Sequence, residues 1–343
     1  MKKVFAIVLV MALILSMVAC GASGGSADTE EKAGTLGVVM PNATHGFLGE
    51  SIAHAKAEAE AIAEETGMDV KFLTSAESSE QNNQIDQLIA DGVDCIVLWP
   101  HNGDEVRSSA QNVMDAGIPL IIYDRLINDF KPTAELMGDN VTIGEMTGEY
   151  FNKFFAEDLK AGKVNILEFK GDNSTVPEQR SSGFKSTADP NINIVQQFST
   201  DWQRAKAMEQ METWLSSSSA ADVEALKAVF THDDEVVLGV LDAIENYDGS
   251  AKLDVKLVSG VGARKENLDT FKPWADKGVM QVTYAFSPAM VREAVELGAD
   301  IVLGKENPSG LILIPTVEVD NSNEQEFRNN DIYVTRYSIE MPQ

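Results

Sequence analysis

Short runs of β-branched and aliphatic residues alternate with longer amphipathic stretches beyond the first 35 residues of the chain. In the amphipathic stretches apolar residues recur at spacings of three and four, and Ile85, Leu88 and Ile89 mark one such helical face. Glycine directly follows two of these stretches, at Gly92 and Gly117, where a left-handed helix cap is expected. The alternation predicts a parallel sheet covered by helices.

The pattern runs through two consecutive units. Predicted strands are 36–40, 70–73, 95–99, 118–123 and 135–138, then 164–169, 192–198, 228–231, 255–259 and 279–284. Predicted helices are 49–65, 80–90 and 104–116, then 176–188, 201–216, 235–247 and 265–277, with a last helix at 288–304 and a strand at 311–315. The chain is therefore expected to be an α/β protein with two similar doubly wound parallel-sheet lobes.

The first 20 residues have the features of an export signal. Two lysines precede a short apolar stretch at 4–15, and small residues lead to Cys20. The stretch is too short to span a membrane. Cysteine directly after Ala19 resembles the bacterial lipobox, in which the thiol receives diacylglycerol, although Met17 stands where leucine is more usual. We expect residues 1–20 to be a lipoprotein signal peptide and Cys20 to be lipidated.

An ordinary signal peptide, cut near Ala19 or Ala22, is the alternative. Residues 21–34 are rich in glycine, serine and charge and lack large apolar groups, which predicts a flexible tether. The chain is therefore expected to be extracytoplasmic, anchored by its lipid to the outer face of the cell membrane or free in the periplasm, with no other membrane contact.

Composition limits the possible partners. The 343 residues include 54 Asp plus Glu against 27 Lys plus Arg, which gives a formal charge of −27. Such a surface repels nucleic acid and anionic headgroups, so DNA and RNA are not expected partners. The same acidity could also serve solubility alone.

Ligands of open parallel sheets bind beyond the carboxyl ends of the strands. Residues of suitable chemistry follow the predicted strands or begin the helices after them: His45, Phe47, Asn102, Asp124, Arg125, Arg180, Trp202, Asp233 and Tyr284. Carboxylates and guanidinium groups can satisfy neighbouring sugar hydroxyls in fixed geometry, and aromatic faces match the C–H faces of a pyranose. The set predicts a sugar held between two lobes that close around it.

Each of these residues also has a simpler interpretation. Asp124 and Arg125 could form a surface pair, and Arg180 could pair locally. Trp202, at the predicted start of a helix, could be a hydrophobic staple. Phe47 could belong to the core, and His45 could be a loop residue. The joint placement at strand ends is the stronger argument.

Several stretches resemble the type 1 periplasmic sugar-binding proteins, the ribose, xylose and galactose group. They are 92–103, 116–125, 138–144, 180–184 and 233–239, and the resemblance extends over roughly 36–320. The stretch 123–129 is most similar to the xylose and multiple-sugar-binding branch.

The resemblance implies a division into 36–138 plus 286–315 for the N-terminal lobe and 139–285 plus 316–343 for the C-terminal lobe. It also implies that Asp124 and Arg125 bind sugar hydroxyls from the first lobe, that Arg180 and Asp233 do so from the second, and that Trp202 stacks on the ring.

Three departures from the family pattern leave the identity of the sugar open. Asp233 stands where asparagine is usual, 262–263 reads Gly-Ala where many members have aspartate, and Ala285 or Phe286 stands where lysine or glutamine is frequent.

The implied function is that of a monomeric solute-binding protein that delivers a pentose or hexose to the permease subunits of an ABC importer. A sensor that presents a sugar or sugar-like signal to a membrane receptor is the alternative. The chain contains no His-Glu-x-x-His and no Cys-x-x-Cys, so we expect no enzyme, no cofactor and no metal.

Overall fold

The computed structural model describes residues 33–330, so the predicted signal peptide and Cys20 lie outside the described residues, as does the end of the chain from 331. Within that range the chain forms two six-stranded sheets, each with its own helices. The first sheet, sheet A, contains β1 (Thr35–Pro41), β2 (Asp69–Ser75), β3 (Cys95–Leu98), β4 (Leu120–Tyr123), β5 (Ala134–Gly138) and β11 (Gly310–Ile314). Sheet B contains β6 (Val164–Lys170), β7 (Ile192–Ser199), β8 (Leu226–Thr231), β9 (Leu257–Ser259), β10 (Met280–Tyr284) and β12 (Glu318–Asp320).

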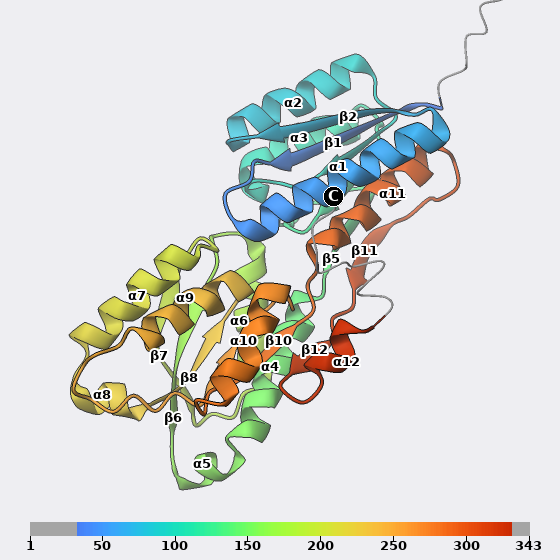
Figure 1. The fold of residues 1–343 in the computed structure, drawn as a ribbon. Helices are drawn as coiled ribbons and strands as arrows, with labels where there is room; N and C mark the ends of the chain where they lie inside the picture. The colour runs from blue at the N-terminus through green and yellow to red at the C-terminus, as the bar shows by residue number, and fades with distance from the viewer. Residues whose placement is uncertain (1–32, 331–343) are drawn as a thin grey trace, which may run out of the picture. The chain divides into compact units, whose positions relative to one another are not determined.

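The strands of the two sheets follow the same spatial order. Their strand orders are β11-β5-β4-β3-β1-β2 and β12-β10-β9-β8-β6-β7. Every pairing in sheet A is parallel, whereas in sheet B β12 runs antiparallel to β10 at the edge. The predicted fold class, two doubly wound parallel-sheet lobes, is confirmed (Figure 1).

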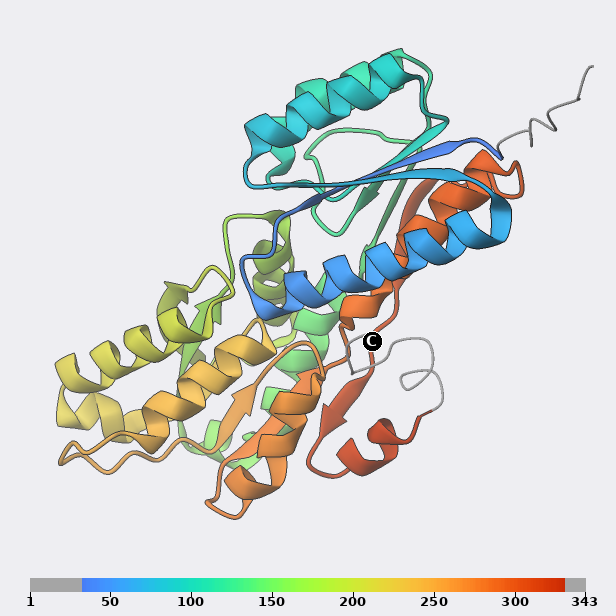
Figure 2. The same ribbon diagram turned by 45° about the horizontal axis from the view of Figure 1, so that its top comes forward.

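Helices cover both faces of each sheet. The lobe of sheet A has α1 (Gly46–Thr66), α2 (Ser78–Asp91), α3 (Gly103–Asp115), η1 (Pro288–Met290) and α11 (Val291–Val302). The lobe of sheet B has α4 (Asn140–Phe154), α5 (Ala156–Ala161), α6 (Thr175–Thr187), α7 (Arg204–Ser217), α8 (Ala220–Ala225), α9 (Asp234–Glu245), α10 (Lys265–Ala275) and α12 (Glu324–Arg328). Figures 1 and 2 show α1 beside α11 on one face of sheet A and α2 beside α3 on the other.

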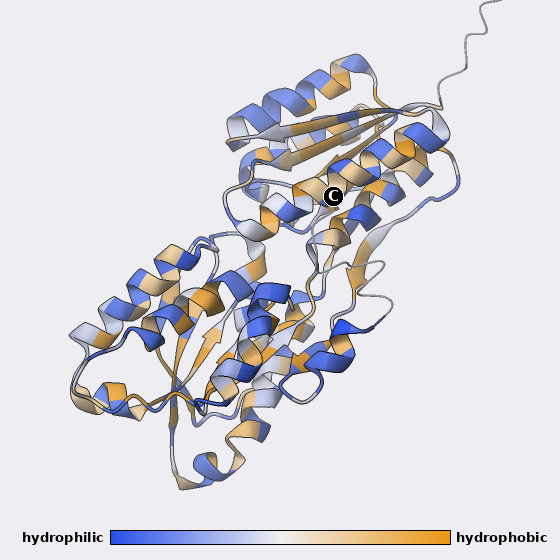
Figure 3. Ribbon diagram, in the orientation of Figure 1, coloured by the Kyte–Doolittle hydropathy of each residue, from blue (hydrophilic) through white to orange (hydrophobic). Residues whose placement is uncertain are grey.

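The hydrophobic pattern follows from this layering. The four residues of β3 and the four of β4 are all buried, because the central strands of a parallel sheet have helices on both faces. A covering helix buries only one stripe; α3, for example, buries Val106, Ala110 and Val113. Figure 3 shows the same division, with hydrophobic colour along the strands and hydrophilic colour on much of the helical surface.

In the second lobe, α4 packs on α6 and α7 packs on α9. The contact of α4 with α6 depends on Gly144 and Gly183, since a Cβ at either position would overlap the backbone of the other helix. The sequence pattern did not predict α4: it contains two glycines and two threonines, which have low helix propensity, so packing against α6 has to stabilise it. The short elements α5, α8, α12 and β12 were not predicted either.

The chain passes between the lobes three times within the described range: from β5 to α4, from β10 to η1 and from β11 to β12. Apolar residues at the second passage, among them Phe286 and Met290, join a core cluster that includes residues of both lobes. Among residues 33–330 no helix combines the length and the hydropathy that crossing a membrane requires.

Candidate functional site

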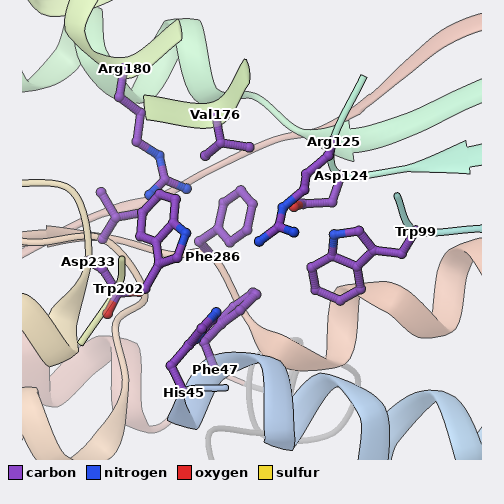
Figure 4. Close-up of a pocket in the computed structure, with 11 residues that line it drawn as sticks. His45, Phe47, Trp99, Asp124, Arg125, Val176, Arg180, Trp202, Asp233 and Phe286 are labelled. Carbon is purple, nitrogen blue, oxygen red and sulfur yellow. The ribbon is translucent and has the colours of Figure 1, made fainter. Parts of the chain in front are cut away.

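A pocket lies between the two lobes, and its empty space, open solvent at its mouth included, is about 390 Å³ (Figure 4). Its polar lining is His45, Asp124, Arg125, Arg180 and Asp233, and its apolar lining is Phe47, Trp99, Val176, Trp202, Val261 and Phe286. Both lobes contribute residues of each kind. The structure therefore places seven of the nine residues singled out in the sequence around one cavity.

An unusual backbone conformation at Asp124 directs its side chain into the pocket. It follows β4 directly and has a φ of 64°, a left-handed value that aspartate tolerates better than most residues. Its backbone N–H donates to Leu136 O at 3.0 Å, which fixes the turn to the neighbouring strand. The carboxyl group is buried at the pocket wall, where the Trp99 side chain hydrogen-bonds to it.

Arg125 connects the two lobes. One of its nitrogens, Nη1, donates to His101 O at 2.8 Å, and Nη2 donates to Asp172 Oδ2 at 2.9 Å. Asp172 follows β6 and belongs to the second lobe. Beside this pair the Leu126 N–H donates to Thr175 Oγ1 at 3.2 Å, so two polar contacts cross the cleft here.

On the opposite side, Arg180 projects from α6 into the pocket. Its Nε donates to Asn140 Oδ1 at 2.9 Å, and its Nη1 donates to the carbonyl of His232. The guanidinium carbon lies 4.8 Å from the ring centre of Phe286 and 5.7 Å from that of Trp202. These contacts hold the guanidinium in one orientation, with Nη2 left for a ligand.

Asp233 follows β8 and caps α9, where its Oδ1 accepts the Glu235 N–H at 2.8 Å. The preceding residue, His232, is fully buried, and its ring lies 3.1 Å from Glu168 Oε1. Because that neighbour is anchored in the core, Asp233 is held rigidly at the pocket wall.

The helix that follows Trp202 begins later than predicted. The helix expected from 201 begins at Arg204, and Asp201 and Trp202 both have left-handed backbones, with φ of 50° and 62°. The indole therefore leaves the chain from a turn that directly precedes Gln203, the N-cap residue of α7. It lies over Gly171, where a Cβ would overlap the ring, and faces His45 at 6.4 Å between ring centres.

Burial shifts the pKa values of three titratable groups that line the pocket. Burial raises the pKa of Asp124 to about 6, although Arg125 and Arg180 oppose the shift. Burial, assisted by the charge of Asp234, raises the pKa of Asp233 to about 7. Burial and the charge of Arg125 lower the pKa of His45 to about 4, so this ring is neutral. Carboxyl groups that titrate near neutrality can donate as well as accept, which suits a ligand with hydroxyl groups.

Asn102 and Tyr284 do not line the pocket, contrary to the sequence prediction. The side chain of Asn102 caps α3 and accepts the Asp104 N–H at 3.0 Å, a role that asparagine often fills at the end of a βα loop. Tyr284 is still within β10, so its side chain packs in the core, with its hydroxyl 3.5 Å from Glu318 Oε2.

The sequence prediction omitted other pocket residues. Trp99 and Val261 follow β3 and β9, so the rule that selected Asp124 applied to them as well, and it applied also to Asp172, which follows β6 and pairs with the pocket residue Arg125. Trp99 ended the predicted strand 95–99, and Val261 was not selected. Val176, on α6, gave no signal of this kind.

Among residues 33–330 no group of three His, Cys, Asp or Glu side chains is arranged to hold a metal ion.

Comparison with known proteins agrees with this architecture. The model of the family described as "Periplasmic binding protein domain" matches residues 36–306. The ribose import binding protein of Bacillus subtilis is 28% identical over 314 residues, 89% of this chain and 95% of the relative. The fructose import binding protein of Bifidobacterium longum is 25% identical over 89% of this chain and 90% of the relative.

Solved structures show the same fold. The periplasmic binding protein of the arabinose ABC transporter from Shewanella sp. ANA-3, bound to α- and β-L-arabinofuranose, superposes with a TM-score of 0.70 at 25% identity, over 88% of this chain and 97% of that chain. On the family match and the shared two-lobed fold, this chain belongs to the periplasmic binding protein family.

Proposed function

We propose that this chain is the extracytoplasmic solute-binding protein of an ABC importer and that it binds one monosaccharide, a pentose or a hexose, in the pocket between its lobes. The observation that carries the proposal is the lining of that pocket. Carboxyl and guanidinium groups from both lobes, Asp124 with Arg125 and Arg180 with Asp233, surround a space flanked by aromatic rings. The role is binding and delivery, without catalysis.

The geometry supports a definite mode of binding. Hydroxyl groups at one end of the sugar would bond to Asp124 and Arg125, and those at the other end to Arg180 and Asp233. Trp202 and Phe47 would contact the C–H surfaces of the ring. Because the polar groups come from both lobes, the sugar gains its full set of bonds only when the lobes are closed, so binding favours closure.

Delivery and anchoring complete the proposal. The relatives are named as import binding proteins, which supports docking of the closed form on the permease subunits of a transporter. We further propose that Cys20 carries a diacylglycerol that holds a monomer on the outer face of the membrane. Conversion of Cys20 to serine should then release the protein from the membrane fraction, and retention of the variant there would contradict the anchor.

The test of the function is a ligand screen on the protein without residues 1–34. Thermal unfolding is recorded against xylose, ribose, arabinose, galactose, glucose, fucose and rhamnose, with amino acids as controls. A ligand that binds only the folded state raises the midpoint as its concentration rises. We expect one or two sugars to raise it by several degrees. A rise with amino acids and with no sugar would overturn the proposed ligand class.

A further inference from the structure

One wall of the pocket is made of apolar side chains, which cannot themselves hydrogen-bond to a sugar. It consists of Val261, Phe286 and Phe47, which we call the apolar wall. These side chains belong to a single buried cluster, and the ring centres of Phe47 and Phe286 lie 5.6 Å apart. Figure 4 shows Phe286 between the two polar groups of the pocket, with Arg180 and Asp233 on one side and Asp124 and Arg125 on the other.

The backbone fixes the apolar wall in place. Val261 and Phe286 follow β9 and β10, and the Phe286 N–H donates to Gly262 O at 3.3 Å, so the two residues lie on adjacent chain segments. Phe286 packs against Gly138, where a Cβ would overlap its ring. The ring therefore has no room to retreat toward the hinge.

The polar group behind the apolar wall at Gly262 is the carboxylate of Asp234. Gly262 has no side chain, and the carboxylate of Asp234 occupies the space where its Cβ would be. That carboxylate is already satisfied: Oδ1 accepts from Asn267 Nδ2 and Thr283 Oγ1, each at 2.8 Å, and Oδ2 accepts from the Arg264 N–H at 2.8 Å.

We infer that the ligand is a sugar whose hinge-facing edge carries a methyl group in place of a hydroxymethyl group, that is, a 6-deoxyhexose; this inference rests on the proposed function. A hydroxyl turned toward the apolar wall and away from the Arg180 guanidinium loses its water and gains no bond from the wall, and such a buried orphan weakens binding about ten- to hundredfold. A methyl group there buries apolar surface against Phe286 and Val261.

The test uses matched pairs of sugars that differ only at that carbon: L-fucose with L-galactose, D-fucose with D-galactose, L-rhamnose with L-mannose and 6-deoxy-D-glucose with D-glucose. Dissociation constants are measured by titration calorimetry on the protein without residues 1–34. We expect at least one deoxy sugar to bind at least tenfold more tightly than its hydroxylated counterpart.

Two substitutions in the wall check the cause. Phe286→Gln provides an amide at the centre of the wall, and Val261→Thr provides a hydroxyl with little change of shape. Each should reduce the preference for the deoxy sugar to within about threefold. Val258→Thr is the matched control, since Val258 is a buried residue of β9 outside the pocket, and it should leave the preference unchanged.

The outcomes separate this inference from the proposed function. Equal or tighter binding of the hydroxylated sugar in every pair that binds, or binding of pentoses alone, would overturn the inference and leave monosaccharide binding intact. Binding of no sugar at all would overturn the proposed function itself.

Discussion

Asp124 and Asp233 show how burial gives single residues of the pocket their chemistry. Asp124 is 5% exposed and Asp233 is 6% exposed, and burial raises the pKa of both carboxyl groups toward neutrality. Such groups can share a proton with a hydroxyl in either direction, whereas an exposed carboxylate only accepts. The carboxyl group of Asp233 therefore offers a donor near neutral pH.

The same shift makes the stability of the protein depend on pH. The pKa of Asp233 is about 7 in the folded protein, against roughly 4 for an unfolded aspartate. Between these values the folded state holds the extra proton, so the stability contributed by this residue is lost as pH rises through 7. Asp124 and Asp234, each raised to about 6 by burial, act in the same direction.

We predict that Asp233→Asn reduces the fall in the free energy of unfolding between pH 5 and pH 8, measured by urea titration. Asparagine still caps α9, so the helix itself should be preserved. Asp86→Asn, a change of an exposed residue on α2, is the control and should keep the wild-type pH dependence. A full wild-type slope in Asp233→Asn would contradict the account.

The residues of the site were predictable where polar chemistry followed a strand. Asp124, Arg125 and Asp233 satisfy that rule and line the pocket. Asn102 satisfies it too but caps a helix, because one side chain at a βα loop can serve either purpose. Of the apolar lining, Phe47 and Trp202 were predicted, whereas Trp99 and Val261 were not, since an apolar residue after an apolar strand looks the same in the core and in a pocket.

At the scale of elements, the close contact of α4 with α6 positions Arg180. Helix α6 carries this residue, and Gly183 on the same helix lies against the Val141 carbonyl of α4. Any side chain at Gly183 would push the two helices apart and move the guanidinium away from Asn140 and from the pocket.

We predict that Gly183→Ala destabilises the protein by about 1–3 kcal/mol in urea unfolding and weakens sugar binding, because overpacking outweighs the better helix propensity of alanine. Gly49→Ala is the control: Gly49 lies on α1, and a Cβ there would meet only the Ala43 Cβ at 3.7 Å, an ordinary contact, so alanine should be neutral or stabilising. Wild-type stability of Gly183→Ala would show that the contact does not position α6.

Most elements followed from hydrophobic periodicity, and the exceptions share a cause. The buried strands β3 and β4 and the amphipathic helix α3 have strong patterns. Helix α4 has a weak one, since its glycines serve contact with α6 and reduce its own propensity. Tertiary packing stabilises such a helix, and the local hydrophobic pattern of its sequence does not reveal that packing.

At the scale of the whole two-lobed body, ion pairs across the cleft stabilise closure. Besides Arg125 with Asp172, the Arg264 Nη2 donates to Glu50 Oε1 at 2.5 Å, and Glu50 belongs to α1 of the other lobe. Arg264 also holds Glu235 of its own lobe at 2.6 Å. The pairs of Arg125 with Asp172 and of Arg264 with Glu50 break when the lobes separate.

We predict that Glu50→Gln shifts the ligand-free protein toward the open form, which small-angle X-ray scattering detects as a larger radius of gyration. Sugar affinity should fall about two- to tenfold, since binding must then close a more open protein. Glu58→Gln is the control, because Glu58 on the same helix pairs with Arg292 within one lobe. An unchanged radius and affinity in Glu50→Gln would remove the pair from the closure mechanism.

The central claim is that one sugar is held by polar groups of both lobes at once. Titration calorimetry with the tightest-binding sugar of the screen tests it on three proteins: wild type, Asp124→Ala from the first lobe and Arg180→Ala from the second. Each variant should keep its fold by circular dichroism and lose at least about tenfold in affinity, the cost of a charge-assisted hydrogen bond. Wild-type affinity in either folded variant would contradict binding between the lobes.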